Sequence, residues 1–154
     1  MTVAEYVLKF LISKKVKNVF LITGGAISFV VDAFSRNKKI QYTCVAHEQA
    51  AAMMADAYSR VGKGFAATMV TSGPGAQNLI TGIACSWYDS VPVIHISGQV
   101  NSYELSSANK STKNVRQVGF QETDVVSMTK PITKFAYQLK SPHEIKYALE
   151  KAFY

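Results

Sequence analysis

Short apolar runs alternate with helix-length segments along the chain. Four runs, at residues 18–22, 40–45, 65–70 and 91–96, are apolar at nearly every position, which is typical of strands buried on both faces of a parallel sheet. Helices are predicted over residues 2–13, 26–35, 49–61 and 76–87, and a last one begins near Ser141-Pro142. Because parallel strands are joined by right-handed crossovers, we expect an α/β fold, a doubly wound parallel sheet with helices on both faces.

The first helix begins with a capping box and not with an export signal. Thr2 and Glu5 have the spacing at which each side chain bonds the other's backbone N–H. Glu5 and Lys9 interrupt the apolar stripe that follows, and no apolar stretch approaches the roughly 18 residues of a membrane span. These features predict a cytoplasmic protein, or one of an organelle whose targeting peptide is absent from this sequence.

Four loops follow the carboxyl ends of the predicted strands. They are Gly24-Gly25, His47-Glu48, Gly73-Pro74-Gly75 and Gly98-Gln99. In a doubly wound sheet such loops gather at one edge, where ligands bind. The alternation alone therefore predicts that these residues lie together.

Glu48 stands between an apolar strand and a small-residue helix. A carboxylate at this position either stabilises the helix, by interacting with the helix dipole and the free N–H groups of the first turn, or takes part in catalysis. The adjoining His47 is a candidate to shuttle protons or orient a substrate. His95 lies inside an apolar strand, so we interpret it as a core histidine.

The glycine loops also allow two interpretations. Gly24-Gly25 is either a tight turn with positive φ or a place where backbone approaches a ligand. The segment from Gly73 to Asn78 matches no phosphate-binding motif, and Pro74 removes a backbone donor. It is either a rigid wall for a flat ligand or an ordinary strand-to-helix turn.

Composition excludes several classes of protein. With 154 residues, 48% hydrophobic and 18% charged, the chain is about one globular domain. The net charge of +7 comes from dispersed lysines, not from a basic run interleaved with aromatics, so nucleic-acid binding is not indicated. Cys44 and Cys85 lie in apolar segments and are expected to be buried free thiols. The cysteines and histidines have no metal-ligand spacing.

Residues 101–128 break the alternation and are expected to be a long irregular loop, functional or disordered. The final helix runs to Tyr154 with no strand after it. Since another strand ordinarily completes such a layer, we expect the chain to be a fragment that lacks its last strand and any downstream domains.

Three segments of the chain together resemble the N-terminal, pyrimidine-binding domain of thiamine-diphosphate enzymes of the acetolactate synthase type. They are His47-Glu48-Gln49, Thr71-Ser72-Gly73-Pro74-Gly75 with Asn78, and Phe120-Gln121-Glu122. The resemblance runs nearly end to end. Thr23, where proline is usual, and the helix 50–57, which is usually richer in glycine, depart from that pattern and leave the substrate open.

The resemblance implies a role for each loop. Glu48 would bond N1′ of the aminopyrimidine and relay the proton that activates the cofactor, and Gly73, Pro74 and Asn78 would contact the pyrimidine. Gly25 would let the backbone approach the partner's cofactor. The substrate side would be lined by Gly24, Ala26, Phe120 and Gln121.

The resemblance also implies that two such chains pair as a homodimer or tetramer around a 2-oxo acid substrate. The diphosphate and Mg²⁺ would be held by a domain not present in this chain, so the isolated chain is expected to be inactive. Two alternatives stay open: a stand-alone α subunit of a two-subunit 2-oxo acid decarboxylase, and a non-catalytic α/β assembly module.

Overall fold

The computed structural model describes residues 1–62, 64–108, 111 and 115–154. It contains a four-stranded, all-parallel sheet of β1 (Asn18–Leu21), β2 (Gln41–Cys44), β3 (Ala66–Val70) and β4 (Val93–Ser97), in the order β2-β1-β3-β4. The chain turns from one side of β1 to the other between β2 and β3, so the switch point of the sheet lies between β1 and β3.

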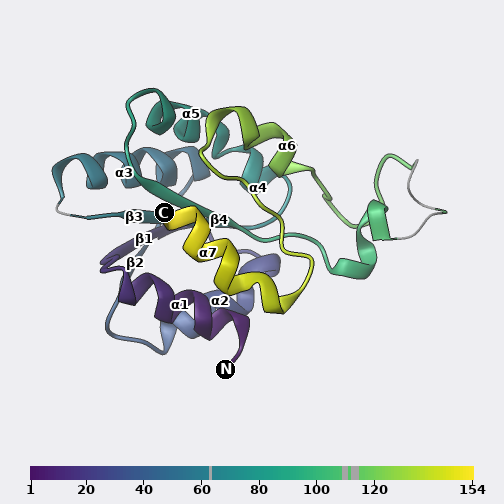
Figure 1. Cartoon of the computed structure of the whole chain (residues 1–154), viewed down its shortest axis with the longest axis horizontal. Coiled ribbons are helices and arrows are strands. Elements are labelled where there is room, and N and C mark those ends of the chain that lie inside the picture. Colours follow the sequence, from purple (N-terminus) through teal and green to yellow (C-terminus); the bar gives the residue numbers. More distant parts are fainter. Residues whose placement is uncertain (63, 109–110, 112–114) are drawn as a thin grey trace.

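Helices cover both faces of the sheet (Figure 1). One layer contains α1 (Val3–Ser13), α2 (Ser28–Ser35) and α7 (Ile145–Phe153); the other contains α3 (Glu48–Val61), α4 (Pro74–Gln77) and α5 (Ile80–Tyr88). The predicted doubly wound fold is confirmed.

Alternate strand residues fill the two layers. Val19 and Leu21 belong to the core beneath α1 and α2, whereas Phe20 packs with Ala51 and Ala55 of α3. Every residue of the central strand β3 is buried. Burial on both faces explains why the strands appear in the sequence as continuous apolar runs.

Several boundaries differ from the prediction. The second helix opens with a 3₁₀ turn, Gly25–Ile27, and the predicted helix 76–87 divides at Asn78 into α4 and α5. Asn78 and Leu79 keep right-handed dihedrals, so the division is slight. The first helix has the predicted capping box, with the Thr2 N–H donating to Glu5 Oε2 at 2.9 Å.

The segment 101–128, expected to be irregular, is partly helical. It contains 3₁₀ turns at Ser102–Glu104 and Ser106–Ala108, and the helix α6 (Val125–Thr129), which the sequence reasoning missed. Further 3₁₀ turns lie at Lys130–Ile132 and Pro142–Glu144. Part of the segment, including Lys110 and Lys113, lies outside the described residues, as does Lys63.

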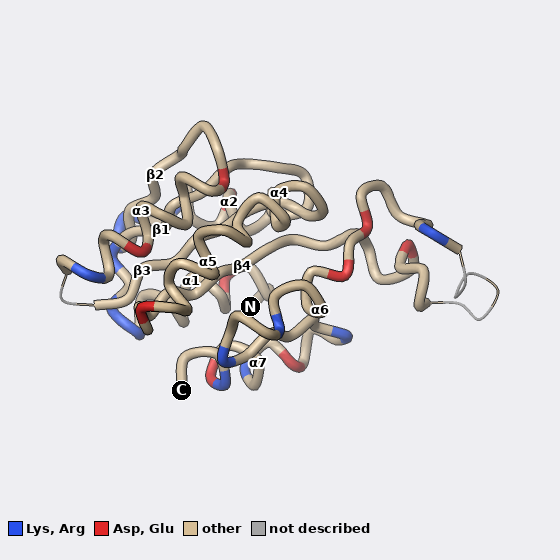
Figure 2. Tube along the Cα trace, turned by 90° about the horizontal axis from the view of Figure 1, so that it is seen from above, with Lys and Arg blue, Asp and Glu red and all other residues tan. Residues whose placement is uncertain are grey.

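The cysteines were predicted wrongly: both Cys44 and Cys85 are exposed. β2 is one of the two edge strands of the sheet, so much of its surface faces solvent, and Cys85 lies on the exposed side of α5. In the described part of the chain, Lys and Arg are spread over many elements and do not line one face (Figure 2). No helix there is long and apolar enough to cross a membrane.

Candidate active site at the carboxyl edge of the sheet

The loops after β1, β3 and β4 touch one another, as the alternation predicted. A Cβ added to Gly24 would lie 2.5 Å from Thr71 Cβ, and one added to Gly98 would lie 2.5 Å from Ala26 Cβ. Both distances are too short for real side chains, so these positions require glycine. The loops therefore form one contiguous surface at the switch point.

Glu48 is the first residue of α3 and lies over the loop that follows β3. Its Oε2 accepts a hydrogen bond from Asn78 Nδ2 at 2.9 Å. Its Oε1 lies 3.5 Å from the place where a Cβ on Gly75 would be. The structure thus brings together Glu48, Asn78 and the glycine turn, which come from two different strand-to-helix connections. Glu48 is half-buried, so its neighbours restrict the position of the carboxylate while a ligand can still reach it.

His47 caps the helix that Glu48 begins. Its Nδ1 accepts a hydrogen bond from the Gln49 N–H at 3.1 Å, and its ring is exposed. This bond requires Nδ1 to be the unprotonated, accepting nitrogen, and it makes His47 the N-cap of α3. A role in proton transfer stays a prediction for Nε2.

The turn at Gly73 is strained in a way that only glycine tolerates. Gly73 has φ +56° and ψ −119°, and a Cβ there would meet Gln121 Cβ at 2.7 Å. Among the described glycines, Gly73 has the positive φ; Gly24 and Gly25 do not, so the positive φ expected for that pair is wrong, although the pair does enter a 3₁₀ turn. Pro74 follows as the first residue of α4, where its missing N–H costs nothing.

Replacing Gly73 by alanine is expected to destabilise the domain by about 1–3 kcal/mol, because a β-carbon is strained at this φ and collides with the Gln121 turn. Chemical denaturation measures the free energy of unfolding. Gly25→Ala is the matched control, since a Cβ there meets nothing within 4 Å. Equal stability of the two variants would contradict this account.

The residues predicted to line a substrate lie around the same edge. Ala26 is exposed and Phe120 is 82% exposed. Gly25, which was predicted to approach the cofactor, lies between Gly24 and Ala26 and is exposed with open space before it. Gln121 has φ +60° and packs its backbone and Cβ against Gly73. Their functional roles stay predictions.

A polar network behind the site was missed in the sequence. Asp56 of α3 is 8% exposed and accepts hydrogen bonds from Arg60 and from Ser86 Oγ, the latter at 2.7 Å. Arg60 also pairs with Asp89 at 2.6 Å. The bond from Arg60 holds the pKa of Asp56 below its ordinary value. The network joins α3 to α5, and the Asp56–Arg60 spacing of four residues was its signal.

His95 lies inside β4, as the apolar pattern predicted, and is half-buried there; its interpretation as a core histidine stays a prediction. Its Nδ1 lies 2.8 Å from Thr68 Oγ1 on the neighbouring strand. Burial lowers its pKa to about 4, so the ring is neutral near pH 7. In the described part of the chain, no group of three or more His, Cys, Asp or Glu side chains could hold a metal ion.

The comparisons with known proteins agree with this geometry. Residues 1–128 match the family model described as thiamine pyrophosphate enzyme, N-terminal TPP binding domain. The chain belongs to this family.

Acetolactate synthase large subunits are among the similar proteins. The chain is 39% identical to acetolactate synthase isozyme 3 large subunit of Escherichia coli over 151 residues, which are 98% of this chain and 25% of that protein. It is 39% identical to a probable acetolactate synthase large subunit of Methanocaldococcus jannaschii, over 97% of this chain and 24% of the relative. The chain therefore spans about a quarter of the length of the curated relatives it matches.

Proposed function

We propose that this chain supplies the pyrimidine-binding half of the active site in a thiamine-diphosphate enzyme of the acetolactate synthase type, which acts on 2-oxo acids. The observation that carries the proposal is the Glu48–Asn78 pair, set beside the Gly73-Pro74-Gly75 turn at the switch point of the sheet. The family match and the acetolactate synthase relatives support it.

The residues at this edge fit an aminopyrimidine. Gly75 leaves the space next to Glu48 Oε1 free of a side chain, so one carboxylate oxygen stays accessible while Asn78 holds the other. A carboxyl group can exchange a proton with a ring nitrogen, and the amide and peptide groups nearby can bond an amino edge. Glu48, Asn78, Gly73 and Pro74 would hold the ring, and Gly25 would let the backbone approach the partner's cofactor.

When bound, thiamine diphosphate supplies the electron sink that decarboxylation of a 2-oxo acid requires. Glu48 would hold or release a proton at N1′ of the pyrimidine, which is general acid–base catalysis. Asn78 fixes the carboxylate rotamer through its 2.9 Å bond, and His47 caps the helix that carries the carboxylate. Phe120 and Gln121 would face the substrate.

The diphosphate and Mg²⁺ are assigned in this proposal to another part of a longer enzyme. The relatives are about four times as long as the chain, and α4 is a helix of only four residues that begins with proline. A cytoplasmic location is part of the same proposal.

Pairing of two chains as a homodimer or tetramer is also part of the proposal. Met53 and Met54 of α3 are 44% and 40% exposed and could meet a partner. Ala51, Ala52 and Ala55 of the same helix are fully buried within the domain, so the exposed methionines and not these alanines are available for that contact.

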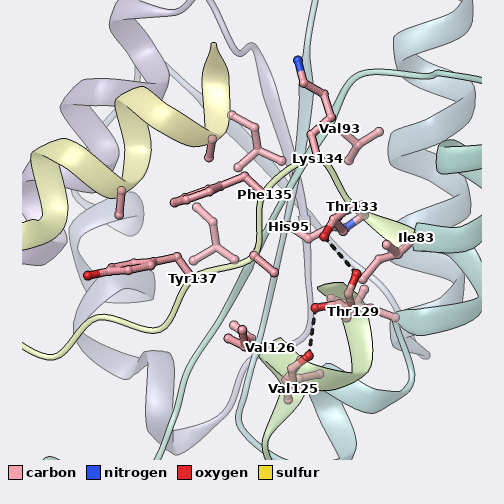
Figure 3. A pocket seen from close by; sticks show the side chains of 18 of the residues that line it. Ile83, Val93, His95, Val125, Val126, Thr129, Thr133, Lys134, Phe135 and Tyr137 are labelled. Atoms are coloured by element: carbon pink, nitrogen blue, oxygen red, sulfur yellow. Dashed lines mark hydrogen bonds between the residues drawn. The ribbon is translucent and has the colours of Figure 1, made fainter. Parts of the chain in front are cut away.

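The open edge of β4 supports the proposal that the chain is one part of a longer protein. A cavity of about 840 Å³ lies between β4, α7 and residues 133–139 (Figure 3), and neither Glu48 nor Asn78 is among the residues that line it. The Gly98 N–H bonds Val70 of β3, so by strand alternation the backbone groups of Val93, His95 and Ser97 face this cavity. Unpaired N–H and C=O groups at a sheet edge favour pairing with another strand. We therefore propose that a further parallel strand fills this cavity.

The proposed function is tested by the release of CO₂ from pyruvate by the complete enzyme. We expect release to require both added thiamine diphosphate and Mg²⁺ after the enzyme has been dialysed against a chelator. Turnover of pyruvate that continues unchanged without the cofactor would refute the proposal.

A further inference from the structure

The turn formed by residues 118–123 joins the proposed cofactor loop to the proposed substrate side. Gln121 packs against Gly73, and its neighbour Phe120 stands 82% exposed at the same edge. Between β4 and α6, residues 101–108 and 115–118 form an excursion that projects from the domain and leads to this turn (Figure 1). Something must therefore hold the turn in place at the base of the excursion.

Glu122 makes that connection with a single carboxylate. Its Oε1 accepts hydrogen bonds from the Ser106 N–H at 2.7 Å and the Ser106 hydroxyl at 2.8 Å, and its Oε2 accepts one from the Val118 N–H at 3.2 Å. Ser106 lies on the outgoing limb of the excursion and Val118 on the returning limb. The carboxylate thus ties the two limbs together next to Gln121.

A second side chain fastens the turn to the sheet. Gln99, two residues after β4, donates from Nε2 to the carbonyl of Thr123 at 2.9 Å, and its Oε1 accepts the Val100 N–H at 2.9 Å. Gly119 also packs against Val100, where a Cβ would meet Val100 Cβ at 2.8 Å. The turn is therefore anchored on both sides of Phe120 and Gln121.

The hydrogen bonds that tie the two limbs together require an ionised Glu122 carboxylate. Burial opposes its ionisation, but hydrogen bonds from Ser106 and from the backbones of Val118 and Gly119 outweigh burial and hold the pKa of Glu122 below its ordinary value. An ionised carboxylate accepts on both oxygens, whereas an amide presents N–H donors on one side. Replacing Glu122 by glutamine therefore breaks one side of the tie without changing its shape.

We propose that Glu122 is a positioning residue for the proposed reaction: it holds the Phe120–Gln121 turn against Gly73, so that the substrate side and the cofactor loop keep a fixed geometry. This inference rests on the proposed function. Glu122 itself touches neither cofactor nor substrate in this account. Its effect reaches the reaction through the turn.

Glu104 provides a matched control on the same excursion. Its carboxylate caps a local 3₁₀ turn, accepting the Asn101 N–H at 3.1 Å and Asn101 Nδ2 at 2.8 Å. These bonds stay within three residues and do not reach Gly73. Glu104→Gln removes the same charge from the same segment without touching the tie.

The test compares Glu122→Gln, Glu122→Asp and Glu104→Gln in the complete enzyme. For Glu122→Gln we expect KM for pyruvate to rise roughly ten-fold or more, because misplaced groups lose that much binding and orientation. We expect thiamine diphosphate affinity to stay within about two-fold, because misplacing this turn leaves Glu48 and Asn78 in place. Glu122→Asp, which keeps the charge, should restore part of the loss, and Glu104→Gln should behave as wild type.

Amide hydrogen exchange supplies a readout that does not depend on activity. Exchange at Ser106 and Val118 should become faster in Glu122→Gln and stay unchanged in Glu104→Gln. Unchanged exchange in Glu122→Gln, faster exchange with unchanged KM, or an equal rise of KM in the Glu104 variant would each overturn the inference. A wild-type enzyme without thiamine-dependent turnover would instead refute the proposed function, and the exchange result would still show whether Glu122 holds the turn.

Discussion

Glu48→Gln is expected to lower the turnover of the complete enzyme by ~10²-fold or more, the usual range for loss of an acid–base group. Glutamine keeps the shape of the side chain and can still bond Asn78, but it cannot exchange a proton with N1′ of the pyrimidine. Cofactor affinity should fall less than turnover, since the contacts from Asn78 and the Gly73-Pro74-Gly75 turn are retained. Hydrogen–deuterium exchange at C2 of bound thiamine diphosphate measures the activation step directly.

The control for this variant is Glu150→Gln. Glu150 is an exposed carboxylate on α7, paired only loosely with Lys146 at 4.0 Å, and it lies in the opposite helix layer. It should leave both turnover and C2 exchange as in the wild type. Near-normal C2 exchange in Glu48→Gln would show that Glu48 does not activate the cofactor.

The fold was predictable because the two central strands, β1 and β3, are buried on both faces. Val19, Phe20 and Leu21 point to alternate sides, yet all three are buried, so the strand is a continuous apolar run that ends at a glycine loop. This apolar pattern, alternating with helices, predicts a parallel sheet whose loops gather at one edge. The meeting of Glu48 with Asn78 adds a contact between two loops that alternation alone places only near each other.

The features that were missed depend on tertiary contacts. The order of the strands makes β2 an edge strand and so exposes Cys44. Strand order cannot be inferred from the pattern of apolar residues in the sequence. The short helix α6 carries only a local signal, with Asp124 accepting the Ser127 N–H at 3.0 Å. The tie from Glu122 to Ser106 spans sixteen residues, so no periodicity could have indicated it.

Binding of thiamine diphosphate by this chain alone is expected to be weak, and catalysis absent. Only pyrimidine contacts are proposed to lie on the chain, and these supply a minor share of the binding energy compared with a diphosphate held by Mg²⁺ and charged groups. The chain should still fold, because β1, β3 and β4 contribute to buried apolar clusters on both faces of the sheet. We also expect it to self-associate through the exposed methionines of α3.

Calorimetric titration of residues 1–154 with thiamine diphosphate and Mg²⁺, beside sedimentation of the same sample, tests this division of labour. The complete enzyme is the positive control, and Met53→Lys with Met54→Lys is the variant that should remove self-association while leaving the fold intact, because both side chains already face solvent. Micromolar binding to a monomer would mean that the diphosphate site lies on this chain. In that case the half-site assigned here to Glu48, Asn78 and the glycine turn would have to be a whole one.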